Sequence, residues 1–179
     1  MSDRTENMSR IKTALAFLVF FSTLAAAAAQ TQHAASTPAE RDRLVKLAAQ
    51  LQASPLDPAL DSDRAWAMKW IDQIPDITIN LCDAVFEPMK DAPHGNLLAE
   101  IFTISATAYI IQHPDKAALD AEVNAAGIKG MLKAYQTIVA RAPRQRTDDL
   151  DDLLGRLKDG TLQQYVNDQT MKCSTNPKS

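Results

Sequence analysis

Hydrophobic residues recur three and four positions apart along most of this chain, which is the spacing of one face of an α-helix. A first helix is predicted to begin after Thr37. Thr37 and Glu40 can form a capping box, and Pro38 suits the first helical position. The inward face of this helix is expected to carry Leu44, Leu47, Ala48 and Leu51.

Two further helices are predicted before the middle of the chain. One covers residues 61–74, places Trp66 and Trp70 on its apolar face, and ends at Pro75. The next is expected to begin near Asp76 and to stop at Pro88. Its predicted apolar residues are Ile77, Leu81, Cys82 and Val85. The segment 87–95 then shows the longest break in periodicity and is predicted to be a loop.

Residues 96–112 are ambiguous, because apolar and polar residues alternate from Phe102 to Ile110 as they would in a strand. However, Glu100, Thr103 and Thr107 share one stripe of a helix, and no second strand is available as a partner. We therefore predict a buried central helix, with that stripe as its narrow solvent-facing edge.

The C-terminal part is also predicted to be helical. A long segment runs from Asp115 or Lys116 to about residue 141, and Gly127 and Gly130 indicate a kink or a close helix contact within it. Its first apolar face is expected to include Leu119 and Val123. Thr147 is predicted to cap a sixth helix that ends before Gly160, and a last helix covers about 161–172. The predicted fold class is all-α, an irregular array of six or seven helices.

The first 29 residues have the features of a secretory signal peptide. Arg4, Arg10 and Lys12 form a positive start, an apolar run covers 14–24, and an alanine tract ends at Ala29. Cleavage near Ala29 predicts export to the periplasm or the medium. The expected organisation is a signal peptide (1–29), a flexible tail (30–36), one helical domain (37–174) tied by a disulfide, and a second tail (175–179).

The two cysteines, Cys82 and Cys173, are predicted to form a disulfide, because an even number of cysteines in an exported chain favours pairing. The alternative is two separate buried thiols. The net charge of the whole chain is −3, which argues against partners such as nucleic acid and anionic membranes. We also expect no stable membrane span in the mature chain, because its apolar runs are too short.

A few polar and aromatic side chains are candidates for binding. His94, His113 and Glu100 could hold a metal or a small ligand, although their spacing matches no ligand motif and loop, cap or helix-edge roles explain them as well. Trp66 and Trp70 could line an apolar pocket, with core packing as the alternative.

Motifs typical of catalysis are missing: there is no nucleophile elbow, phosphate loop or dinucleotide fingerprint. The sequence therefore favours a non-enzymatic protein, and we predict no catalytic residue, metal site or cofactor. The alternative is an enzyme whose residues converge only in space.

One part of the chain resembles the Tai-like immunity proteins, which guard the periplasm against secreted amidase toxins. The resemblance covers about a third of the chain: Cys82, the helix that ends at 109–114 (Tyr-Ile-Ile-Gln-His-Pro), and the alanine-rich helix through 125–135. It implies a small, exported, disulfide-containing helical protein that plugs a toxin's cleft. Phe86-Glu87-Pro88-Met89 stands where that family has a glycine-aromatic segment.

These observations together predict an exported protein that binds another periplasmic or secreted protein, with the loop 87–96 and the helix 61–74 as candidate surfaces. The alternatives are a small-ligand or metal-binding module, an immunity or chaperone-like protein of the periplasm, and an enzyme with dispersed residues.

Overall fold

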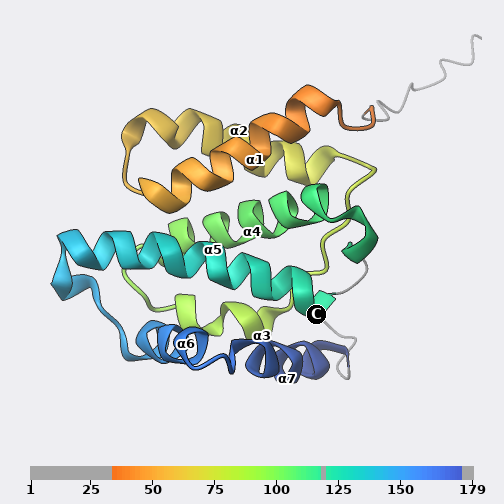
Figure 1. Ribbon diagram of the computed structural model, residues 1–179. Coiled ribbons are helices and arrows are strands. Elements are labelled where there is room, and N and C mark those ends of the chain that lie inside the picture. The colour runs from red at the N-terminus through yellow and green to blue at the C-terminus, as the bar shows by residue number, and fades with distance from the viewer. Residues whose placement is uncertain (1–33, 118–119, 175–179) are drawn as a thin grey trace, which may run out of the picture. The chain divides into compact units, whose positions relative to one another are not determined.

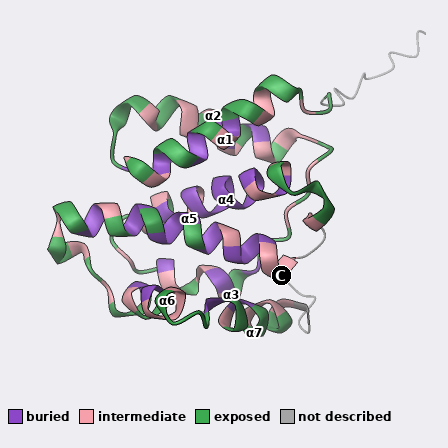
Figure 2. Cartoon of the chain, in the orientation of Figure 1, coloured by how far each residue is buried: buried purple, intermediate pink, exposed green. Residues whose placement is uncertain are grey.

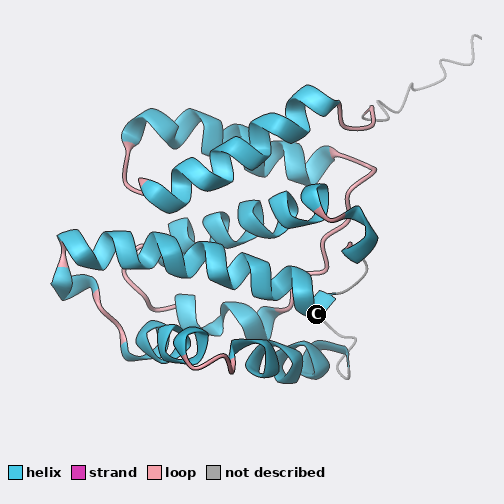
Figure 3. Ribbon diagram, viewed as in Figure 1, coloured by secondary structure: helices cyan, strands magenta, loops and turns pink. Residues whose placement is uncertain are grey.

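The computed structural model describes residues 34–117 and 120–174, and over these ranges it contains helices and loops without strands (Figures 1 and 3). The all-α prediction is confirmed. The predicted signal peptide and the 175–179 tail lie outside the described residues. The helices are α1 (Pro38–Ala53), α2 (Asp61–Gln73), α3 (Asp83–Phe86), α4 (Gly95–Gln112), α5 (Asp120–Arg141), α6 (Asp148–Lys158) and α7 (Leu162–Ser174). Short 3₁₀ turns lie at Pro58–Leu60, Glu87–Met89, Pro114–Lys116 and Pro143–Gln145. Within the described ranges, no helix has the length and apolarity that a bilayer span requires.

Helices α4 and α5 lie at the centre of the fold. Helices α1 and α2 pack on one side of this pair, and α3, α6 and α7 pack on the other (Figure 1). The middle of α4, residues 101–108, is buried all round, as the purple ribbon in Figure 2 shows. A helix enclosed by neighbours needs no polar face, which explains why its sequence pattern resembled a strand.

The closest approach in this centre is between α4 and α5. A methyl group on Gly127 would lie 2.8 Å from the ring of Phe102. A methyl group on Gly130 would overlap Ser105 and lie 2.9 Å from the Gln52 amide nitrogen of α1. The predicted close helix contact at these glycines is confirmed, and it requires that neither residue has a side chain.

The predicted solvent-facing edge of α4 was wrong for two of its three residues. Thr103 and Thr107 are 6% and 0% exposed. Their hydroxyls donate to the carbonyl oxygens of Ala99 (3.0 Å) and Thr103 (2.8 Å) one turn back. Because a threonine can satisfy its hydroxyl on its own helix in this way, it needs no contact with water.

The helix predicted from Asp76 was also wrong for most of its length, since α3 covers only Asp83–Phe86. The residues before it are not helical; Ile77 and Ile79 are half-buried while Thr78 and Asn80 are exposed. This alternation has the two-residue period of extended backbone, which β-branched residues favour. The Asn124 side chain of α5 holds the segment by donating to the Asn80 carbonyl oxygen at 3.2 Å.

The long helix predicted to begin at Asp115 or Lys116 also starts later than predicted. A 3₁₀ turn occupies Pro114–Lys116, and α5 is described from Asp120. Leu119, predicted on its first face, lies outside the described residues. The caps further on are confirmed: the Thr147 hydroxyl accepts from the Leu150 N–H, and Gly160 adopts a φ of 75° after α6.

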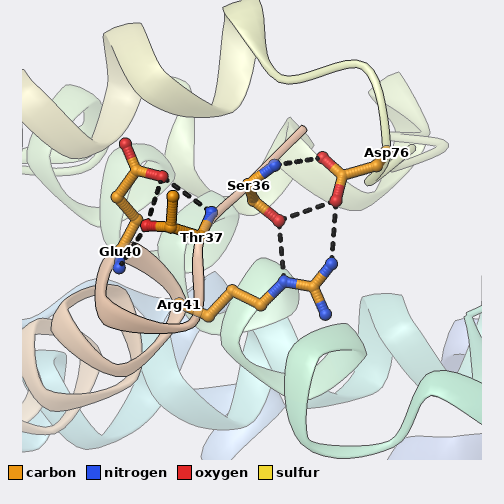
Figure 4. Close-up of polar contacts among 5 residues, drawn as sticks. All are labelled: Ser36, Thr37, Glu40, Arg41 and Asp76. Carbon is orange, nitrogen blue, oxygen red and sulfur yellow. Dashed lines mark hydrogen bonds and ion pairs between the residues drawn. The ribbon is translucent and has the colours of Figure 1, made fainter. Parts of the chain in front are cut away.

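The start of α1 is fixed by a network of polar contacts (Figure 4). Thr37 and Glu40 form the predicted capping box. The backbone N–H and hydroxyl of Ser36 donate to Asp76 at 2.9 and 2.7 Å, and Arg41 pairs with the same carboxylate at 2.8 Å. The donors from Ser36, with Arg41 in addition, lower the pKa of Asp76 to about 2. The entry into α1 is therefore tied to the loop after α2.

The two cysteines form the predicted disulfide. Their Cα atoms lie 5.8 Å apart, and the bond links residues 91 positions apart in the sequence. Cys82 ends the extended segment, and Cys173 lies in the last turn of α7. The bond therefore fixes the C-terminal helix to the middle of the chain.

Replacing both cysteines by alanine is expected to lower the free energy of unfolding by up to about 4.6 kcal/mol, because the unfolded chain regains the entropy of a long open loop. Urea unfolding of the oxidised protein and of the variant measures this difference. Wild-type protein kept under reductant is the control and should follow the variant. An unchanged midpoint would contradict the expectation.

Gly127→Ala is expected to destabilise the protein by about 1–3 kcal/mol, because the new methyl group collides with the Phe102 ring. Gly155→Ala on α6 is the matched control. No heavy atom lies within 4 Å of its added methyl group, so the better helix propensity of alanine should stabilise the protein by up to about 1 kcal/mol. Thermal unfolding of the two variants should show midpoint shifts of opposite sign, and equal shifts would contradict the close contact.

The pKa of Asp76 predicts a specific acid sensitivity. Because the folded-state pKa is depressed, its stabilisation is present above about pH 4 and is lost as the pH falls toward 2. Asp76→Asn should therefore unfold at a lower temperature than wild type at pH 6, and the difference should shrink toward pH 2. Melting curves across this range measure it, and a difference that does not vary with pH would argue against the assignment.

Candidate functional site

The histidines and the glutamate predicted as ligands are far apart. His94 and His113 flank α4 at its two ends, and eighteen residues of helix separate them by about 27 Å. Glu100 pairs with Arg64 of α2 at 2.7 Å. Among the residues that the structure describes, no group of three His, Cys, Asp or Glu side chains could hold a metal ion.

The two tryptophans lie together on α2. Their rings stack with centroids 5.7 Å apart. Trp70 is 7% exposed and belongs to the main core, while the guanidinium of Arg43 lies 3.8 Å from the ring centre of half-buried Trp66. Their faces are thus covered by the protein itself.

The loop 87–96, predicted as a binding surface, surrounds a small hollow of about 270 Å³. Phe86, Met89 and Ala99 supply its apolar lining. His94 lies in this loop, outside the lining of the hollow, and has a φ of 59°, a left-handed conformation that is uncommon for a residue other than glycine. The backbone turns sharply here, since a side chain on Gly95 would overlap the Met89 carbonyl.

A larger hollow is an open groove of about 1030 Å³ along the first half of α5. The second half of α4 and the second half of α1 provide its other sides, and α7 adds two amides near the start of α5. We call it the α1–α4–α5 groove. Its lining residues are Val45, Ala48, Ala49, Gln52, Ser105, Ala108, Tyr109, Gln112, Asp120, Ala121, Glu122, Ala126, Lys129, Gly130, Lys133, Gln163 and Asn167.

Small residues line much of this groove. Ala48 of α1, Ala108 of α4 and Ala126 of α5 have short side chains, which leave space that longer side chains would fill. The Gln52 amide donates to the Ser105 hydroxyl at 3.2 Å, at the point where Gly130 brings the three helices together. The same close packing that builds the core therefore also shapes this hollow.

A polar cluster closes one end of the groove. The Glu122 carboxylate accepts hydrogen bonds from Lys116 at 2.7 Å and from the Tyr109 hydroxyl at 3.0 Å, and the Tyr109 ring contacts His113. These bonds lower the pKa of Glu122, and the bond to Glu122 raises the pKa of Lys116. Burial and the bond to Glu122 raise the pKa of Tyr109. Glu122, Lys116 and Tyr109 thus keep their usual charges near neutral pH, whereas a general acid or base needs a pKa near the working pH.

The rest of the groove carries amides and two lysines. Gln112, Gln163 and Asn167 offer both donors and acceptors, and Lys129 and Lys133 lie one turn apart on α5. Both lysines are exposed, and neither forms an ion pair with another described residue. The groove can therefore form hydrogen bonds and ion pairs along its length.

Sequence reasoning missed this groove, although part of its signal is present in the chain. The small residues of α5 recur at helical spacing, and Lys129 and Lys133 repeat at four positions on the same face. The sequence pattern of α5 does not reveal which helices pack against this face. The groove exists only because α1 and α4, which are distant in the sequence, lie against it.

Comparison with models of protein families, with curated proteins and with solved structures finds no match to this chain.

Proposed function

We propose that this chain is an exported helical protein that binds another protein, and that the α1–α4–α5 groove receives a segment of that partner. The observation that carries the proposal is the groove itself: it is long, open, and lined by small residues and by polar groups. The positive and apolar pattern of residues 1–29 and the disulfide support export to an oxidising compartment.

The lining favours a polypeptide segment over a small molecule. Small-ligand pockets enclose most of their ligand and are lined mainly by apolar and aromatic side chains. Here Tyr109 is the one aromatic residue in the lining, and the groove opens to solvent. Small side chains allow a partner backbone to approach closely, and a helix laid in a groove is a common way for proteins to recognise each other.

The alternative of a metal or small-ligand site has less support. It needs His94, Glu100 and His113 to converge, whereas they lie along the whole length of α4 and Glu100 is already paired with Arg64.

A photo-crosslinking amino acid placed at Gln112, inside the groove, is expected to give a covalent adduct with one discrete partner in intact cells. The same group at Gln136, exposed on α5 outside the groove, is the position control. Gel electrophoresis and mass spectrometry of the purified protein identify the adduct.

Filling the groove should abolish this adduct. The double variant Ala49→Gln/Ala126→Gln extends two side chains into the groove, and Ala53→Gln/Ala140→Gln makes the same exchange at exposed positions of the same two helices outside it. Loss of the Gln112 adduct only in the first variant, with unchanged melting temperatures, supports the proposal. No adduct at Gln112, or an adduct that survives filling, would refute it.

A further inference from the structure

We propose that the segment received by the groove is acidic, and that its carboxylates pair with Lys129 and Lys133. This inference rests on the function proposed above and adds the chemistry of the partner. It follows from two observations: which charged side chains line the groove, and which of these charges are already neutralised by other residues of the protein.

The two lysines form an uncompensated positive pair. They lie four residues apart on one face of α5, so their like charges repel each other in the free protein. No described carboxylate forms an ion pair with either of them. Other exposed basic residues, such as Lys46 and Lys69, also lack a described ion pair, but Lys129 and Lys133 differ from them because both line the groove.

The carboxylates of the groove do not balance this pair. Glu122 is neutralised by Lys116 and also accepts from Tyr109. Asp120 accepts from the Asn80 amide at 3.0 Å and lies in the first turn of α5, where the helix dipole favours a negative charge. Nine residues of helix put Asp120 about 13 Å from Lys129, which exceeds the Debye length of about 8 Å at physiological ionic strength.

The spacing of the lysines defines what a partner must offer. Four residues of helix separate them by about 6 Å along the axis of α5. Carboxylates four residues apart on a helix, or two apart on an extended segment, match this separation. The amides of Gln52 and Gln112 on the facing helices can then bond to the partner backbone.

A polypeptide fits these charges better than other anionic partners. Nucleic acids and anionic bilayers are bound by broad basic stripes that neutralise many phosphates. Two lysines on a chain of net charge −3 do not form such a stripe. A short acidic segment needs only the two cations that the groove provides.

The test uses the full-length mature protein and a display library of random 15-residue peptides. Peptides that bind the wild type but not the Ala49→Gln/Ala126→Gln variant are groove-dependent, and their sequences are determined. The proposal predicts an excess of Asp and Glu among them. It also predicts that Lys129→Gln/Lys133→Gln weakens their binding about threefold to thirtyfold at low salt, as expected for two exposed ion pairs.

The matched control is Lys46→Gln/Lys69→Gln, which removes the same charge from exposed positions on α1 and α2 outside the groove and should leave affinity within about twofold. Groove-dependent peptides without an acidic excess, or with equal affinity for both lysine variants, would overturn this inference while leaving the proposed function intact. No groove-dependent peptide at all would overturn both. Groove-dependent binding of phosphatidylglycerol vesicles or single-stranded DNA in place of acidic peptides would also overturn the inference.

Discussion

The close contact between α4 and α5 is the constraint on which the rest of the structure depends. Gly127 lies against the Phe102 ring, and Gly130 lies against Ser105 and the Gln52 amide. Because these two positions carry no side chain, α5 can lie directly on α4 while α1 packs beside both. The same approach brings together the parts of α1, α4 and α5 that line the groove.

Two further ties hold the outer helices to this centre. The disulfide fixes α7 to the end of the extended segment, and the Ser36–Asp76–Arg41 contacts fix the entry of α1 to the start of that segment. The segment between α2 and α3, residues 74–82, therefore serves as the anchor for both ends of the described chain. Because it is held at Asn80 by the buried Asn124 of α5, both ties lead back to the central pair.

Local signals in the sequence predicted most of the fold. Caps, prolines and apolar spacing located the helices, as at Thr37 and Thr147, and the disulfide followed from the cysteine count. The failures have one cause: burial by distant segments. Thr103 looks polar in the sequence but satisfies its hydroxyl within α4, and Ile77 belongs to an extended strip whose packing against α5 no local pattern reveals. The groove was missed for the same reason, since three helices from separate parts of the chain form it.

Amide hydrogen exchange tests the central claim most directly, because it reports which contacts open without unfolding the whole protein. The account predicts that the slowest amides lie in residues 102–110 of α4 and 127–135 of α5, and that they exchange only through global unfolding. Amides of α1 and α7 should exchange faster. If the α4 and α5 amides exchanged through local openings whose free energy is far below that of global unfolding, this would contradict the view that the pair holds the protein and its groove together.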